Sequence, residues 1–216
     1  MMIKVMLVDD HALVRAGIKR LLDDIEGIEV VDEADCGETA IDKARKNMPD
    51  VILMDVNMPG IGGLEATRKL MQIEPELKVI VVTVHAGEPF PTRLLEAGAC
   101  GYLTKDCGQS EIVNAIHSVS KGDRYIGANI AQKIALSMMP GANKSPFDSL
   151  SQREMQVMLM VTQGQNAQEI SDRLCLSPKT ISTYRHRLFE KLGVDNDVEL
   201  TRLAILHGMI ENGVNS

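Results

Sequence analysis

Short apolar runs alternate with longer segments of helical period over the first half of the chain. Each run has the length of a β-strand, and three are rich in valine and isoleucine. The runs are IKVMLV (3–8), IEVVDEA (28–34), VILM (51–54), KVIVVT (78–83) and GYLT (101–104). The segments between them, such as 13–22, 39–45, 64–71 and 91–97, carry apolar residues three and four positions apart. This alternation predicts a doubly wound, five-stranded parallel sheet with helices on both faces.

Polar side chains occur where four of the five predicted strands end, and these ends share one edge of a parallel sheet. They are Asp9 and Asp10 after the first run, Asp55 after the third, Thr83 ending the fourth, and Thr104 and Lys105 at the fifth. Taken singly, such an aspartate is usually a turn former or a helix cap, and such a lysine is a solvated surface residue. Their convergence from distant segments indicates a reactive site instead.

The residue types at this edge suggest a specific chemistry. Crowded carboxylates repel one another, and a hard divalent cation with oxygen ligands, such as Mg²⁺, relieves that repulsion. An adjacent Asp55 carboxylate is then able to attack phosphorus in line and form an aspartyl phosphate. Lys105 is suited to neutralise phosphoryl charge, and the Thr83 hydroxyl to donate a hydrogen bond to a phosphoryl oxygen.

The second half of the chain has a different organisation and charge. Residues 1–121 hold 13 Lys+Arg against 20 Asp+Glu, whereas residues 145–216 hold 7 against 9. No strand-like run is expected after Gly122; Ile126–Met139 is compatible with a helix, and PGANKSP (140–146) cannot continue it. We therefore predict one domain over 3–121, a linker with a possible helix over 122–146, and a second domain over 147–212.

Helix signals recur in the second domain, and together they predict four short helices. Ser151 and Glu154 have the spacing of a capping box, ahead of a helix that Gly164 stops. A short helix and a tight turn follow. Ser177 caps a third helix that has Pro178 at its first position and ends at Gly193.

The third of these helices has one apolar and one polar face. Its predicted inward residues are Ile181, Tyr184, Leu188 and Leu192. The outward residues are Lys179, Ser182, Thr183, His186, Arg187 and Lys191. A short helix, a turn and a longer helix with small polar and basic residues outward is the helix-turn-helix arrangement, whose second helix enters the major groove of DNA.

Four segments of the first domain, VDDH (8–11), DVNMPG (55–60), VVTVH (81–85) and GYLTKD (101–106), resemble the receiver domain of bacterial two-component response regulators. The resemblance covers about residues 3–121 and implies a flavodoxin-like fold. It implies that Asp55 is the phosphoacceptor and that Mg²⁺ is held by Asp10 directly, by Asp9 through water and by the Asn57 backbone carbonyl. It also implies that Thr83 and Tyr102 form a switch pair and that Lys105 is the invariant lysine of the family.

The stretch 150–194 resembles a LuxR-type helix-turn-helix through LSxRE, a G-x-x-x-x-E-I run and LSPKTISTYRHRLFEKLGV. That resemblance makes Ser182, Thr183 and His186 the expected readers of base edges. It assigns phosphate or flanking contacts to a second set and dimerisation to the last helix. The second set is Lys179, Thr180, Tyr184, Arg187 and Lys191.

The two domains together are similar to the NarL/FixJ subfamily, and segment 85–107 is nearest to the GacA/UvrY/VarA group of gammaproteobacterial regulators. The resemblance implies phosphorylation by a sensor histidine kinase or its phosphotransfer domain. It implies that the phosphorylated homodimer then binds promoter DNA, in contact with RNA polymerase, and activates small regulatory RNA genes of the Csr system. Beyond Mg²⁺-dependent phosphorylation and dephosphorylation of itself, no enzymatic activity is implied.

Other functions are weighed against this one. A phosphatase of the haloacid-dehalogenase type needs an aspartate two residues after the nucleophile, where this chain has Asn57. A small-molecule sensor needs an aromatic-lined pocket, and the chain has no Trp, three Phe and three Tyr. Four cysteines without a CxxC pair, no signal peptide and no apolar run near ~20 residues predict a cytoplasmic protein without a membrane span.

Overall fold

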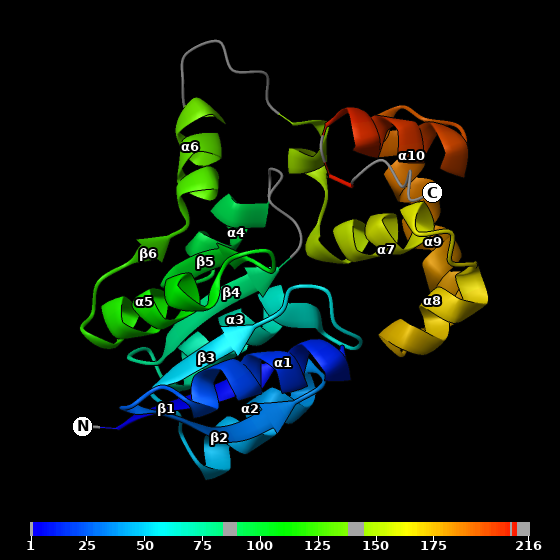
Figure 1. Ribbon diagram of the computed structural model, residues 1–216. Helices are drawn as coiled ribbons and strands as arrows, with labels where there is room; N and C mark the ends of the chain where they lie inside the picture. The colour runs from blue at the N-terminus through cyan, green and yellow to red at the C-terminus, as the bar shows by residue number, and fades with distance from the viewer. Residues whose placement is uncertain (1, 84–89, 138–144, 208, 211–216) are drawn as a thin grey trace. The chain divides into compact units, whose positions relative to one another are not determined.

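The computed structural model describes residues 2–83, 90–137, 145–207 and 209–210, which form two compact units (Figure 1). The first unit holds the β-sheet and ends at Gln132, and the second holds the helices from residue 146 onward. Within the described residues, no helix has both the length and the apolar character needed to cross a membrane.

The first unit is built on a parallel sheet with the strand order β2-β1-β3-β4-β5-β6. Five strands have the bounds that the apolar runs predicted: β1 (Ile3–Val8), β2 (Ile28–Ala34), β3 (Val51–Met54), β4 (Lys78–Thr83) and β5 (Gly101–Thr104). Every adjacent pair is parallel, so the carboxyl ends of these strands lie at one edge, as expected. The predicted fold class is confirmed.

The prediction of five strands was wrong by one, because β6 (Tyr125–Ile126) adds a sixth. It pairs in parallel with β5, with Gly101 opposite Tyr125 and Tyr102 opposite Ile126. Two residues are too few to show the apolar alternation by which a strand is recognised. The strand lies inside the stretch 122–146 that was predicted to be a linker, so the first unit continues past residue 121.

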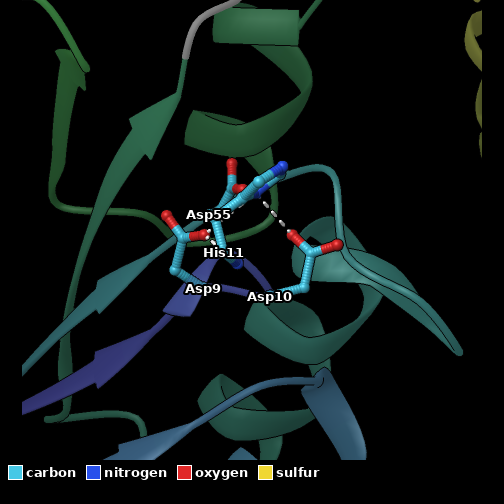
Figure 2. A group of neighbouring side chains, drawn as sticks. All are labelled: Asp9, Asp10, His11 and Asp55. Atoms are coloured by element: carbon cyan, nitrogen blue, oxygen red, sulfur yellow. Dashed lines mark hydrogen bonds and ion pairs between the residues drawn. The ribbon is translucent and has the colours of Figure 1, made fainter. Parts of the chain in front are cut away.

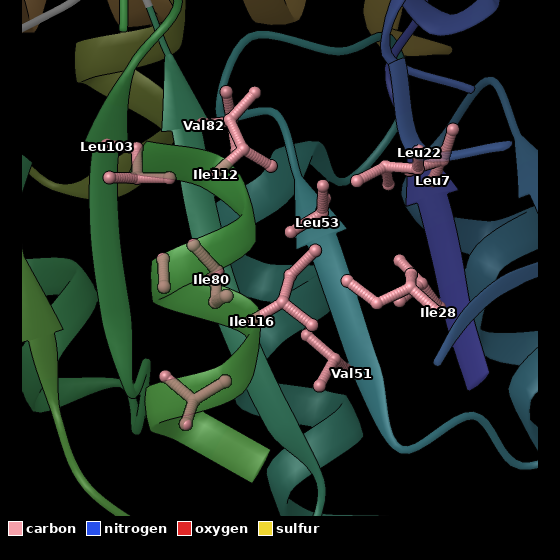
Figure 3. Packing of buried hydrophobic residues seen from close by; sticks show 13 residues of the cluster. Leu7, Leu22, Ile28, Val51, Leu53, Ile80, Val82, Leu103, Ile112 and Ile116 are labelled. Carbon is pink, nitrogen blue, oxygen red and sulfur yellow. The ribbon is translucent and has the colours of Figure 1, made fainter. Parts of the chain in front are cut away.

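Helices cover both faces of the sheet because its central strands are apolar on both sides. In β1, Val5 and Leu7 belong to one buried cluster, with residues of α1 (Ala12–Asp23) and α5 (Gln109–Ser120) (Figure 3). Met6 and Val8 belong to the opposite cluster, with residues of α2 (Gly37–Lys46) and α3 (Gly62–Ile73). This alternation is the period of a pleated strand. α4 (Phe90–Glu96) precedes β5.

α6 (Ala128–Ser137) follows β6 and lies within the stretch Ile126–Met139 in which a helix was thought possible. The predicted end of that helix at Met139 and most of the turn-rich segment 140–146 fall outside the described residues. The next described element after α6 is a short 3₁₀ helix, η1 (Pro146–Ser149), which the sequence did not signal.

Four helices follow η1, as predicted: α7 (Gln152–Thr162), α8 (Ala167–Leu174), α9 (Pro178–Leu192) and α10 (Asp197–Leu206). The Ser151–Glu154 capping box at α7 is confirmed. At α9 the Ser177 side chain accepts a hydrogen bond from the Thr180 N–H, and Gly193 ends the helix with φ +65°. Only glycine adopts that left-handed conformation without steric cost. α7 and α8 both pack against α9, whose Ile181 and Leu188 are buried.

Candidate functional site

Asp9 and Asp55 lie side by side because they directly follow the adjacent strands β1 and β3, in which Val8 is opposite Met54. The sheet hydrogen bonding extends into these positions: the Asp55 N–H donates to the Val8 carbonyl at 2.8 Å. Both carboxylates are buried, Asp55 being 3% exposed and Asp9 5%. The buried strand therefore fixes the depth and direction of the Asp55 carboxylate.

Lys105 brings a positive charge between these two carboxylates. Its Nζ lies 2.6 Å from Asp9 Oδ2 and 2.8 Å from Asp55 Oδ2. Burial raises the pKa of Asp55, as does the charge of Asp9, and Lys105 only partly opposes that rise. Burial alone would lower the pKa of Lys105, but the Asp55 and Asp9 carboxylates outweigh it and raise that pKa. The lysine is thus a permanent cation at the predicted phosphoryl site.

The other oxygen of Asp55 faces the loop that follows β3. Asp55 Oδ1 accepts hydrogen bonds from the backbone N–H groups of Val56, at 2.7 Å, and Asn57, at 3.4 Å. These bonds orient the carboxylate from one side while Lys105 holds it from the other. The loop is itself held by Glu38 of α2, whose carboxylate accepts the Ile61 N–H at 3.0 Å.

Asp10 and His11 complete one side of the pocket, which we call the acidic pocket and define as Asp9, Asp10, His11 and Asp55 (Figure 2). One ligand atom from each of the four lies within 4.8 Å of the others. A set dominated by carboxylate oxygens suits a hard divalent cation. The residues present therefore fit the metal that the receiver resemblance implies.

Thr83 and Tyr102, the predicted switch pair, lie on the adjacent strands β4 and β5. Thr83 is opposite Thr104 and Val81 is opposite Tyr102, so the two side chains project from the same face of the sheet. Tyr102 is fully buried, at 0% exposure, and so is Thr83. Both side chains therefore point into the protein and not into solvent.

Two residues that support the acidic pocket were not found from the sequence. Arg15 donates to the Asp9 backbone carbonyl at 2.6 Å and also pairs with Glu33. Glu38 orders the loop after β3, as described above. Both are helix residues whose role depends on a tertiary contact, so no local pattern marks them.

The polar face of α9 is the second candidate site, and most of its predicted contact residues are accessible. The exposed ones are Lys179, Ser182, Thr183, His186, Arg187 and Lys191, while Thr180 and Tyr184 are half-buried. The Ser182 and Thr183 hydroxyls donate to the carbonyls of Pro178 and Lys179, one turn back. Contact with a base edge requires these hydroxyls to exchange that bond for a new one.

Two ion pairs fix α9 within the second unit, and the sequence indicated neither. Arg185 donates from Nη2 to both carboxylate oxygens of Asp197, at 2.7 and 2.6 Å. Lys191 Nζ lies 2.7 Å from Glu154 Oε2 and 3.2 Å from the Ser149 carbonyl oxygen. The Lys191 charge is therefore shared with a carboxylate of this unit, which reduces what it can offer to DNA.

Glu154 should make the second unit sensitive to acid. The residue is 3% exposed. Burial alone would raise the pKa of its carboxylate, but hydrogen bonds from Lys191 and Ser151 outweigh burial and hold that pKa below the usual 4.5. Because the pKa of Glu154 is lower in the folded state, its charge stabilises the fold at any pH above its pKa in the unfolded state. This stabilisation is lost as the pH falls through its pKa in the folded state. Glu154→Gln should lose about 1–3 kcal/mol of unfolding free energy at pH 7 and show a flatter acid dependence below pH 5.

Urea unfolding of the full chain, followed by NMR signals of α7 at pH 7, 5 and 3.5, measures this difference. The exposed Glu190→Gln on α9 is the matched control and should behave as wild type. Equal acid dependence in wild type and Glu154→Gln would contradict the assignment.

Comparisons with known families match both halves of the chain. Residues 5–117 match the family described as response regulator receiver domain, and residues 148–204 match bacterial regulatory proteins of the luxR family. The chain therefore belongs to the two-component response regulators, with a receiver domain joined to a LuxR-type DNA-binding domain. The resemblance drawn from the sequence is confirmed.

Particular relatives cover nearly the whole chain. The response regulator GacA of Pseudomonas aeruginosa is 59% identical over 211 residues, which are 97% of this chain and 99% of that protein. The response regulator UvrY of Escherichia coli is 56% identical over 209 residues, 96% of each. Among solved structures, RcsB of Salmonella enterica serovar Typhimurium is 26% identical in sequence, with a TM-score of 0.68. The match covers 93% of this chain and 98% of RcsB, which was solved bound to promoter rprA in the presence of phosphomimetic BeF3⁻.

Proposed function

We propose that Asp55 accepts a phosphoryl group from a phosphohistidine on a sensor kinase or its phosphotransfer domain. The observation that carries the proposal is a buried carboxylate held on one side by Lys105 and on the other by the backbone N–H groups of Val56 and Asn57. A carboxylate oxygen attacks phosphorus, the bond between phosphorus and the histidine nitrogen breaks, and that nitrogen leaves with the electron pair. Fixed geometry matters because a displacement of ~1 Å can cost ~100-fold in rate.

The cation that we propose for this pocket is Mg²⁺. Asp10 and Asp55 would hold it directly, Asp9 through water, and Asn57 through its backbone carbonyl. When bound, it supplies positive charge that reduces the repulsion between the carboxylates and the incoming phosphoryl group. Lys105 neutralises further phosphoryl charge, and the same pocket later admits the water that hydrolyses the aspartyl phosphate. The only reactions proposed are the phosphorylation of Asp55 and the hydrolysis of the resulting aspartyl phosphate.

Thr83 and Tyr102 convert this event into a conformational change. A phosphoryl group on Asp55 is bound better by the arrangement with Thr83 drawn toward it and Tyr102 turned inward, the position that Tyr102 has in this structure. The phosphoryl group needs only a few kcal/mol of preference for one arrangement to shift the population. We propose that the shift frees the DNA-binding domain to dimerise on promoter DNA through α10, where Val198, Arg202 and Leu206 form an exposed stripe with a spacing of four residues.

On DNA, the N-terminal part of α9 enters the major groove. Ser182, Thr183 and His186 are the proposed base readers. Phosphate or flanking contacts are proposed for Lys179, Thr180, Tyr184, Arg187 and Lys191, with a smaller share for Lys191 because Glu154 holds its ammonium group. By analogy with the GacA and UvrY relatives, we propose that the regulator acts in the cytoplasm, contacts RNA polymerase and activates small-RNA genes of the Csr system.

His186→Ala and Lys179→Ala should separate base reading from phosphate contact. His186→Ala should weaken binding to the promoter site by about 1–3 kcal/mol and leave binding to unrelated DNA nearly unchanged. Lys179→Ala should weaken both and reduce the magnitude of the salt slope by about one. Titration of labelled DNA at several salt concentrations measures both effects, and each variant serves as the control for the other. Identical profiles for the two variants would contradict the division of roles.

The proposed function is tested by phosphorylation of the purified full chain. Incubation with Mg²⁺ and either acetyl phosphate or a phosphorylated kinase should yield a phosphoryl adduct that is labile to base and hydroxylamine. Peptide mapping should place the adduct at residue 55. The modified protein should elute as a dimer and bind promoter DNA more tightly than the unmodified protein. No adduct at residue 55 with a competent donor would end the proposal.

A further inference from the structure

His11 lies at the mouth of the acidic pocket, and packing does not account for its position. It is the residue before α1, and its backbone N–H donates to Asp9 Oδ1 at 2.8 Å, which fixes the start of its side chain beside that carboxylate. The imidazole is 61% exposed. Figure 2 shows it between Asp9 and Asp10, close to Asp55.

The Nδ1 atom of His11 faces the carboxylate oxygens. It lies 3.0 Å from Asp10 Oδ1 and 3.3 Å from Asp9 Oδ1. It also belongs to the set of four ligand atoms that lie within 4.8 Å of one another. Ligands on opposite sides of one cation, each bonded at about 2.0–2.3 Å, stand roughly 4–4.6 Å apart. A contraction of a few tenths of an ångström would therefore bring His11 Nδ1 into one coordination shell with Asp10 and Asp55, while Asp9 stays bound through water.

We propose that His11 Nδ1 is a direct ligand of the divalent cation in this pocket, and that it makes the pocket favour transition-metal ions over Mg²⁺. The inference rests on the proposed function, because it needs a cation at that site. Mg²⁺ prefers oxygen ligands, whereas imidazole nitrogen suits ions further along the series from Mn²⁺ to Zn²⁺. The pocket can thus bind Mg²⁺ through its carboxylate oxygens. With Mn²⁺ or Co²⁺, His11 Nδ1 would add one further bond.

The nitrogen bond can be detected without any measurement of activity. Mn²⁺-loaded full chain should show ¹⁴N modulation in electron spin echo envelope spectroscopy, and ¹⁵N labelling of histidine should replace it with ¹⁵N features. His11→Ala should lose the signal and bind Mn²⁺ about tenfold more weakly, with Mg²⁺ affinity reduced less than threefold. His117→Ala, in α5 of the same unit, is the matched control and should keep both the signal and the affinity.

Two results separate this inference from the function beneath it. If Mn²⁺ binds, is displaced by Mg²⁺ and supports phosphorylation of Asp55, but no histidine nitrogen couples to it, the role of His11 is overturned and the proposed function stands. If Mn²⁺ binding is absent or is unchanged by Asp10→Asn, and Asp55 is not phosphorylated, both are overturned. An equal loss of Mg²⁺ and Mn²⁺ affinity in His11→Ala would also overturn the proposed selectivity.

Discussion

Asp55→Ala is expected to abolish phosphorylation of the chain and, with it, every phosphate-dependent gain in dimerisation and DNA affinity. Alanine has no oxygen with which to attack phosphorus. The fold should persist, because burial raises the pKa of Asp55 and the native state therefore gains nothing from its charge at neutral pH. Lys105 keeps Asp9 as a partner at 2.6 Å. The unfolding free energy should therefore change by about 1 kcal/mol or less.

The measurement is covalent incorporation of phosphoryl from acetyl phosphate, followed by DNA titration with and without the donor. Asp50→Ala is the matched control: the same residue type stands at the opposite end of β3, where its carboxylate accepts the Lys4 N–H at 2.8 Å. That variant should incorporate phosphoryl normally. If acetyl phosphate raised the DNA affinity of Asp55→Ala, the assignment would be refuted. A tenfold rise in affinity would correspond to about 1.4 kcal/mol of binding free energy.

The central sheet could be predicted because its strands are apolar on both faces and bounded by polar residues. All five predicted runs form strands with the expected bounds. β6 could not be predicted, since Tyr125 and Ile126 join the sheet only through backbone bonding to β5. η1 was missed for a similar reason: it is one short turn, fixed by burial of Phe147 rather than by any periodic pattern.

The acidic pocket was predicted in its main residues because strand ends in a parallel sheet bring distant positions together. Asp9, Asp55 and Lys105 meet as expected: Lys105 Nζ lies 2.6 Å from Asp9 Oδ2 and 2.8 Å from Asp55 Oδ2. The supporting contacts of Glu38 and His11 depend on rotamers and on tertiary packing, which a single sequence does not encode locally. In the second unit, capping residues have fixed spacings and were predicted, whereas the Lys191–Glu154 pair, 37 residues apart, was not.

Gly63 links the stability of the receiver to the position of Asp55. A Cβ at Gly63 would lie 1.9 Å from the backbone oxygen of Asp55 and 2.9 Å from the Val56 Cα. Both are backbone atoms, so no side chain can rotate away to relieve the clash. The close approach is supported by the Gly63 N–H, which donates to the Val56 carbonyl at 3.0 Å. α3 can pack against the end of β3 only because this residue has no side chain.

Gly63→Ala is therefore expected to lower the unfolding free energy of the receiver by roughly 3 kcal/mol or more, since the substitution forces α3 and the Asp55 backbone apart. Any folded protein should also be phosphorylated ~100-fold more slowly if Asp55 moves by ~1 Å. Gly17→Ala is the matched control: Gly17 lies in α1 with no atom within 4 Å of an added Cβ, so alanine should stabilise the helix by about 0.5–1 kcal/mol. Urea unfolding followed by NMR signals of α1 and α3 measures both changes. Wild-type stability together with a wild-type phosphorylation rate in Gly63→Ala would show that the loop after β3 yields easily, and that the carboxylate is not held by this contact.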